Sequence, residues 1–169
     1  MTFCDAGCGV GSLTIPLLKS GVKEIQVSDI SDSMIEETKL RVKNAGLSSK
    51  KIKYKVSDLE KLTGKFDFVI CLDVFIHYPQ SVAEEMVKHL CSLSTSRLIV
   101  SFAPYTPLLA LLKNIGKIFP GPSKTTRAYT LKEDGIISAA RERNFTVVQK
   151  KLNQAPFYFS KLIEFQKIK

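Results

Sequence analysis

The sequence predicts an α/β fold: a mostly parallel, seven-stranded sheet with helices on both faces. Short apolar strand patterns alternate with helical patterns along the chain, which is typical of strand-helix-strand units in a parallel sheet. The last two strand patterns follow each other without a helical pattern between them. With 169 residues, 44% of them hydrophobic, the chain fits a single domain, residues 1–169, with its own core.

The expected elements follow in chain order. Strands are expected over Thr2–Asp5, Glu24–Ser28, Lys51–Val56, Phe66–Leu72, Arg97–Phe102, Phe145–Lys151 and Tyr158–Gln166. Helices are expected over Leu13–Ser20, Asp32–Ala45, Val82–Leu93, Thr106–Ile118 and Lys132–Arg143. The second helix has three candidate N-caps, Ser31, Asp32 and Ser33. Glu36 and Glu37 are expected in its first turn, where the helix dipole favours acidic side chains.

A glycine-rich stretch, FCDAGCGVGS at 3–12, joins the first strand to the first helix. Glycines at Gly7, Gly9 and Gly11 allow the backbone to approach a ligand closely. The spacing differs from a dinucleotide fingerprint, and the loop lacks the lysine of a phosphate-binding P-loop. Because Asp5 precedes the glycines, a cationic ligand such as S-adenosylmethionine (AdoMet) is favoured over a phosphate. The pattern resembles motif I of class I AdoMet-dependent methyltransferases; the alternative is a turn without a ligand.

Acidic residues end the next three parallel strands. Ligands of open α/β sheets bind beyond the carboxyl ends of the strands, so these residues are candidate cofactor contacts. Asp29, followed by Ile30, is placed to accept both ribose hydroxyls, and Asp58, followed by Leu59, to accept the adenine amino group. Asp73 would bring its carboxylate or its backbone near the methionine amine. Each acid could instead be a turn or helix cap.

Composition narrows the classes of partner. The formal net charge of +9 favours anionic partners, either a small substrate or an acidic lipid surface. The basic residues are scattered and no nucleic-acid module is recognised, so no nucleic acid is expected. Neither a membrane span nor a signal peptide is visible. The four cysteines lack C-x-x-C spacing and are expected to be buried thiols, with no protein-bound metal: Cys4, Cys8, Cys71 and Cys91. Asp67 lies at the start of a strand and is expected to have a structural role.

Four further stretches carry a narrower resemblance: CLDVFIHYPQS at 71–81, RLIVSFAP at 97–104, FPGPSKTTRAY at 119–129 and FYFSKLIE at 157–164. They resemble runs of the magnesium protoporphyrin IX O-methyltransferase family, which has the Rossmann-like class I methyltransferase fold. The resemblance covers nearly the whole chain in order. It implies transfer of a methyl group from AdoMet to one propionate carboxylate of magnesium protoporphyrin IX, in chlorophyll biosynthesis.

The resemblance also implies substrate-side residues. His77 corresponds to the active-site histidine and would orient the substrate carboxylate, because a propionate is already ionised at neutral pH and requires no general base. Tyr78 would pack on AdoMet or on the macrocycle, and Lys124 and Arg127 would hold the second propionate. The alternatives are a backbone-bonded loop histidine, a core tyrosine and solvated loop charges.

Further expectations rest on the same resemblance. Magnesium chelatase is the implied protein partner, and a plastid, with peripheral membrane contact, is the implied location, or the cytoplasm in a bacterium. The magnesium belongs to the substrate. We expect the family's helical lid segment before motif I to be absent from this chain, and Tyr105 stands where the family commonly has lysine. Two alternative functions are a class I methyltransferase for another small acid or amine, and a non-catalytic AdoMet-binding fragment.

Overall fold

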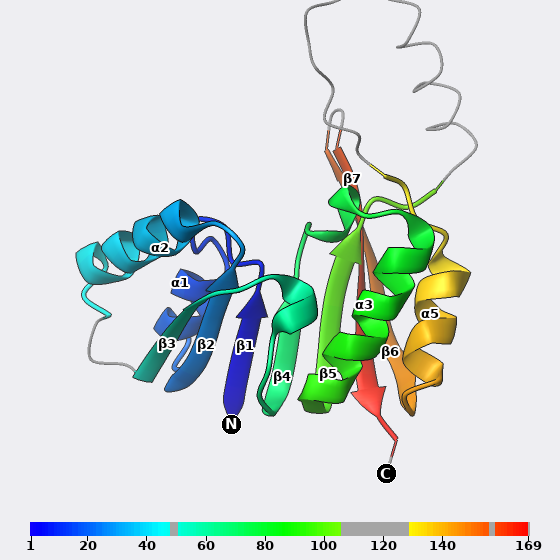
Figure 1. The fold of residues 1–169 in the computed structure, drawn as a ribbon, viewed down its shortest axis with the longest axis horizontal. Helices are drawn as coiled ribbons and strands as arrows, with labels where there is room; N and C mark the ends of the chain where they lie inside the picture. The colour runs from blue at the N-terminus through cyan, green and yellow to red at the C-terminus, as the bar shows by residue number, and fades with distance from the viewer. Residues whose placement is uncertain (48–50, 106–128, 156–157, 169) are drawn as a thin grey trace, which may run out of the picture.

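The computed structural model describes residues 1–47, 51–105, 129–155 and 158–168, and its strands form one seven-stranded sheet (Figure 1). The strand order is β3-β2-β1-β4-β5-β7-β6, with β7 antiparallel to both neighbours and the other pairs parallel. This confirms the predicted mostly parallel sheet. The strands are β1 (Thr2–Ala6), β2 (Glu24–Asp29), β3 (Lys51–Val56), β4 (Phe66–Cys71), β5 (Ser94–Phe102), β6 (Phe145–Ala155) and β7 (Tyr158–Lys167).

The helices between the strands agree closely with the expected ones. They are α1 (Thr14–Lys19), α2 (Asp32–Asn44), α3 (Gln80–Leu93) and α5 (Glu133–Arg141), with the short 3-10 helices η1 (Leu59–Lys61) and η2 (Phe75–His77). The helix expected over Thr106–Ile118 lies outside the described residues. Across the four described ranges, no helix has the length and apolar character needed to cross a membrane.

The helices cover both faces of the sheet, as predicted. One apolar cluster joins α1 and α2 to β2 through side chains such as Leu18, Ile35 and Ile25. The other joins α3 and α5, which lie side by side in Figure 1, to β4, β5 and β7. Phe3 packs on the first cluster and Cys4 belongs to the second. Because consecutive side chains of a strand point to opposite faces, the two clusters lie on opposite sides of β1.

At the start of α2, one of the three candidate N-caps, Ser31, is confirmed in position, whereas the acids expected in the first turn were wrong. Ser31 is the N-cap residue but makes no side-chain cap hydrogen bond. Its backbone N–H donates to Asp29 Oδ1 at 2.9 Å, and its hydroxyl lies 2.8 Å from the hydroxyl of Ser33. Since α2 begins at Asp32, the only acid of the first turn is Asp32, and Glu36 falls in the second turn. Glu37 follows it in that turn.

Asp67 has the structural role that was expected. Its carboxylate accepts hydrogen bonds from the Thr2 backbone N–H at 2.8 Å and from the Thr95 hydroxyl at 3.2 Å. The hydrogen bond from the Thr2 amide is the main reason that the pKa of Asp67 is lowered. These contacts join the amino end of β1 to β4 and β5. The four cysteines are buried and their thiols are free, so their predicted burial is confirmed.

The topology places a ligand-binding edge at one end of the sheet. The chain proceeds outward from β1 through β2 to β3 and then returns to β4 on the other side of β1. The strand order therefore reverses between β1 and β4, the place at which open α/β sheets bind ligands. The carboxyl ends of these strands all lie at the upper edge of the sheet in Figure 1.

Candidate active site

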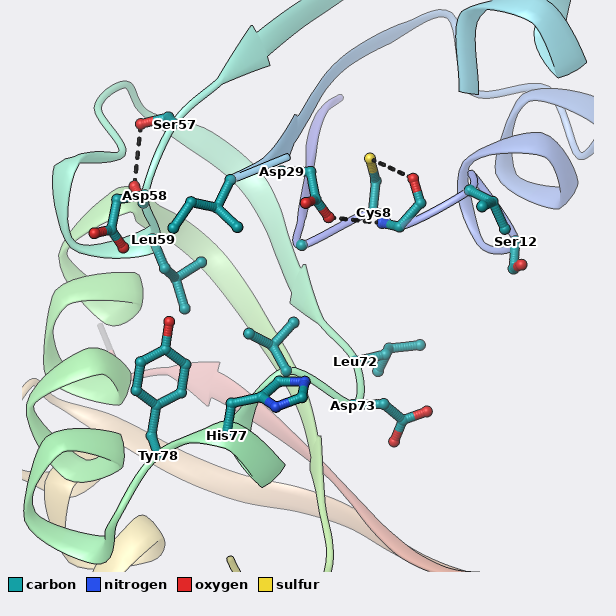
Figure 2. A pocket seen from close by; sticks show the side chains of 15 residues that line it. Cys8, Ser12, Asp29, Ser57, Asp58, Leu59, Leu72, Asp73, His77 and Tyr78 are labelled. Atoms are coloured by element: carbon teal, nitrogen blue, oxygen red, sulfur yellow. Dashed lines mark hydrogen bonds between the residues drawn. The ribbon is translucent and has the colours of Figure 1, made fainter. Parts of the chain in front are cut away.

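A cavity of about 590 Å³ lies at the carboxyl ends of β1 to β4. Its volume is in the usual range for small-molecule sites. Most of the predicted site residues line it, from the four segments that follow β1, β2, β3 and β4, and several are drawn in Figure 2. Those that line the cavity are Gly7, Gly9, Asp29, Ile30, Asp58, Leu59, Asp73, His77 and Tyr78. Lys124 and Arg127 lie outside the described residues.

The glycine-rich loop is fixed to β2 and α2. The backbone N–H groups of Gly7 and Cys8 both donate to the Ser28 carbonyl, at 2.8 and 2.9 Å. The Thr38 hydroxyl of α2 donates to the Gly9 carbonyl at 2.9 Å. These contacts satisfy loop backbone groups, so the loop is held in place before any ligand binds.

Asp29 connects this loop to the start of α2. Its Oδ2 accepts the Gly9 N–H at 2.9 Å, and its Oδ1 accepts the Ser31 N–H at 2.9 Å. A carboxylate has about four acceptor positions, so each oxygen can accept a further hydrogen bond. Asp29 lines the cavity, and two hydroxyls of a ligand could occupy the remaining positions.

Asp58 stands at the N-cap position of η1, but its side chain makes no capping hydrogen bond. The alternative that Asp58 serves as a helix cap is therefore not supported. The preceding residue, Ser57, donates its N–H to the Asp29 carbonyl at 2.9 Å, which brings the ends of β2 and β3 together. Asp58 and Asp29 thus lie on the same edge of the cavity.

Asp73 is held differently from the other two acids. Its backbone has φ 59°, and its Oδ1 accepts hydrogen bonds from the hydroxyls of Ser101 at 2.8 Å and Ser160 at 3.1 Å. Its N–H donates to Ser101 Oγ at 2.8 Å. Figure 2 shows the carboxylate pointing away from His77. Of the two expected contacts, carboxylate or backbone, this arrangement favours the backbone of Asp73 as the group that faces a ligand.

Asp5 and Gly11, both predicted to contact a cofactor, do not line the cavity. Asp5 is 2% exposed and its Oδ2 accepts the Thr14 hydroxyl at 2.5 Å. Because its strand position points it toward α1, it lies beneath the loop and not on the cavity surface. Burial raises the pKa of Asp5 to about 6, although the hydrogen bond from Thr14 opposes this shift. Its direct role is to hold the start of α1.

Asp5 should make stability depend on pH. The pKa of Asp5 rises from 3.8 to about 6 on folding, so between these values the folded chain binds more protons than the unfolded chain. Stability is then lost as pH rises, by about 3 kcal/mol in total for this group. In Asp5→Asn the amide oxygen can still accept from Thr14. Urea unfolding from about pH 4 to about pH 7 should show parent stability falling relative to this variant; a constant difference would contradict the assignment.

His77 and Tyr78 enter the cavity from η2 and its end. The His77 N–H donates to the Val74 carbonyl at 3.2 Å and the Tyr78 N–H to the Phe75 carbonyl at 3.2 Å. His77 is exposed, whereas Phe75 is fully buried and fixes η2 to the core. Burial raises the pKa of Tyr78, and the negative charge of Asp58 raises it further.

The charge of the cavity distinguishes between ligand classes. Among the described lining residues there are three aspartates and one histidine, and neither lysine nor arginine. Such a lining suits a ligand that carries positive charge and hydroxyl groups, and it does not suit a phosphate. The residues present therefore fit AdoMet. Within the described ranges, no group of three or more His, Cys, Asp or Glu side chains is placed to hold a metal ion.

Several residues that shape the site were not predicted. Thr38 and Arg41 of α2 hold loop carbonyls, the latter through Nη1 at 2.7 Å from the Val10 carbonyl. Ser101 and Ser160 orient Asp73. Thr38 gave one signal, since it lies on the apolar face of α2 with Ile35 and Val42. Ser101 and Ser160 come from distant strands, and the sequence carries no signal that they would contact Asp73. Further lining residues that were not predicted are Cys8, Val10, Ser12, Ser57, Leu72 and Val74.

Comparison with known families agrees with the fold and the site. The family described as magnesium-protoporphyrin IX methyltransferase C-terminus matches residues 71–167, and a methyltransferase domain family matches residues 3–95. Magnesium protoporphyrin IX methyltransferase, chloroplastic, of Arabidopsis thaliana is 48% identical over 97% of this chain. Magnesium-protoporphyrin O-methyltransferase of Synechocystis is 46% identical over 95% of it. The chain spans 52% of the Arabidopsis relative and 70% of the Synechocystis relative.

Solved structures give the same result. A crystal structure of magnesium protoporphyrin IX methyltransferase from Synechocystis with bound S-adenosylhomocysteine has a TM-score of 0.89 and 42% identity, covering 98% of this chain and 74% of that chain. A second, with bound S-adenosylmethionine, has a TM-score of 0.82 and 36% identity, covering 98% and 69%. The fold and the site thus define a class I AdoMet-dependent methyltransferase domain. The chain belongs to the magnesium-protoporphyrin IX methyltransferase family, as its sequence motifs predicted.

Proposed function

We propose that this chain, acting as one AdoMet-binding domain, transfers a methyl group from AdoMet to a propionate carboxylate of magnesium protoporphyrin IX and gives the monomethyl ester. The observation that carries the proposal is the cavity at the switch point, whose described lining has three aspartates and neither lysine nor arginine. Family membership over residues 71–167 supports the choice of substrate. The same membership supports a place in chlorophyll biosynthesis.

The cofactor end of the cavity is assigned to strand-end residues. Asp29 accepts the two ribose hydroxyls on the acceptor positions that Gly9 and Ser31 leave open. Asp58, which has no capping hydrogen bond, accepts the adenine amino group. The backbone of Asp73 contacts the amine of the methionine part of AdoMet. Bound there, AdoMet supplies a methyl group on a positively charged sulfur.

His77 is assigned to positioning the substrate. It is exposed at the cavity and stands on η2, which the buried Phe75 fixes to the core. A propionate has an ordinary pKa near 4.3 and is ionised at neutral pH, so His77 has no proton to remove. Its contribution is to orient the carboxylate, and orientation alone can lower a barrier by several kcal/mol. Lys124 and Arg127 are assigned to the second propionate on the family resemblance.

The cellular setting follows from the relatives. The chloroplastic name of the Arabidopsis relative and the cyanobacterial source of the other support a plastid, or the cytoplasm of a bacterium. Contact with magnesium chelatase and with a membrane surface belongs to the same proposal. Co-precipitation with chelatase subunits and flotation with vesicles of plastid lipid composition test these two contacts separately.

The transfer itself is tested by incubating the chain with labelled AdoMet and magnesium protoporphyrin IX. We expect labelled monomethyl ester, and much less product from metal-free protoporphyrin IX or simple carboxylic acids. Labelling of a simple carboxylic acid or amine in preference to the porphyrin would overturn the proposed substrate.

In His77→Ala, turnover should fall by about 100-fold while calorimetry shows unchanged AdoMet binding, because only orientation is lost. A kcat that follows a group titrating near 6.5, lost in the variant, would overturn the orienting role.

A further inference from the structure

Tyr78 stands next to His77 in the sequence, yet its side chain goes to a different part of the cavity. Figure 2 shows its hydroxyl pointing toward Leu59, across the cavity from η2. Tyr78 is half-buried and packs partly on the core cluster that includes Leu59 and Phe75. Its backbone is extended, with φ −121° and ψ 140°, and its N–H is bonded to the Phe75 carbonyl. The core cluster therefore holds the Tyr78 ring, while the hydroxyl end of the side chain reaches the loop after β3.

Electrostatics agree with this direction. After burial, the negative charges of Asp58 and Glu60 are the largest causes that raise the pKa of Tyr78. Both acids belong to the segment around η1, so the phenol lies within their field. The hydroxyl of Tyr78 thus faces the end of the cavity formed by the loop after β3.

The end of the cavity near Asp58 also has apolar surface to cover. Ile30 lines the cavity and its side chain is 67% exposed. It follows Asp29, whose carbonyl accepts the Ser57 N–H, so Ile30 lies at the same edge as Asp58. A flat aromatic base beside Asp58 would contact both Ile30 and the Tyr78 ring. Bases stack readily on aromatic side chains, whatever their hydrogen-bonding edge.

We infer that Tyr78 forms a wall of the adenine end of the cavity and packs its ring on the adenine base, and that it is not part of the methyl-transfer end. The inference rests on the proposed function in one respect, that AdoMet is the ligand. It narrows the expected role of Tyr78, which was to pack on AdoMet or on the macrocycle. Tyr78 becomes a residue that selects the cofactor by its adenosine half.

Calorimetric titration with three ligands tests this directly: AdoMet, S-adenosylhomocysteine and adenosine. In Tyr78→Ala all three should bind about tenfold more weakly, because all three lose the same base contact. In Tyr78→Phe, which keeps the ring, all three should stay within about twofold of the parent. His77→Ala is the matched control at the neighbouring position, and it should leave adenosine binding unchanged.

Two results would overturn the inference. One is a Tyr78→Ala protein that binds adenosine as tightly as the parent but transfers methyl groups slowly, since Tyr78 would then belong to the methyl end. The other is a Tyr78→Phe protein as weak as Tyr78→Ala, since the ring would then not be the contact. Should Tyr78→Ala fail to fold, Tyr78→Leu keeps apolar bulk without a flat face, and unchanged adenosine binding in that variant overturns the inference equally. These titrations need no porphyrin, so failure of the proposed substrate would leave their outcome readable.

Discussion

Replacing Gly7 with alanine is expected to destabilise the fold and to weaken AdoMet binding together. Gly7 has φ +80°, and a Cβ atom built on it would lie 2.3 Å from Val74 Cγ2. Val74 lines the cavity between β4 and η2, so it cannot give way without moving the cavity wall. Overpacking of this kind costs about 1–3 kcal/mol. The left-handed backbone adds about 1–2 kcal/mol for a residue with a side chain.

Gly9→Ala is the matched control. Gly9 also has a positive φ of +53°, but no atom lies within 4 Å of the position of an added Cβ. Only the backbone cost should remain, about 1 kcal/mol. Urea unfolding should therefore rank the parent above Gly9→Ala and Gly9→Ala above Gly7→Ala, and calorimetry should show weaker AdoMet binding by Gly7→Ala than by the parent. Equal losses in the two variants would mean that contact with Val74 has no part in shaping the cavity.

Local sequence signals were sufficient for most strands but not for the start of β5. The strand begins at Ser94, whereas the pattern predicted Arg97. Hydroxyl side chains in succession normally indicate a turn, because they bond to nearby backbone. Here Thr95 donates to the carbonyl of Phe66, on the neighbouring strand β4, at 3.2 Å, while Ser94 bonds locally to the Arg97 carbonyl at 2.8 Å. The neighbouring strand, which the local pattern does not reveal, decides the strand start.

The same distinction separates the site residues. Asp29 and Asp58 lie on the cavity where their strand-end positions predicted, because the sheet topology alone brings carboxyl ends together. The orientation of Asp73 depends on Ser101, 28 residues away in the chain. The burial of Asp5 depends on how α1 places Thr14 over it. Position along a strand was thus predictable, whereas the direction of each carboxylate required the packed structure.

Asp29→Ala is expected to cause the largest loss of AdoMet affinity. The substitution removes the acceptor proposed for the ribose hydroxyls and also leaves the Gly9 and Ser31 N–H groups without the partner they have at 2.9 Å. Losing hydrogen bonds to a charged acceptor costs about 1.5–3 kcal/mol. The dissociation constant for AdoMet should rise by about 10- to 100-fold. Binding of S-adenosylhomocysteine should weaken equally, because the ribose is common to both ligands.

Asp58→Ala separates the two contributions of Asp29. Asp58 lines the same cavity, but its side chain makes no capping hydrogen bond to the backbone. Its removal should therefore weaken AdoMet binding with little change in stability, whereas Asp29→Ala should lower both affinity and the free energy of unfolding. An unchanged dissociation constant in a folded Asp29→Ala protein would remove Asp29 from the cofactor site. Lost stability with full affinity would restrict Asp29 to holding the loop, since the ribose would then be bound by other groups.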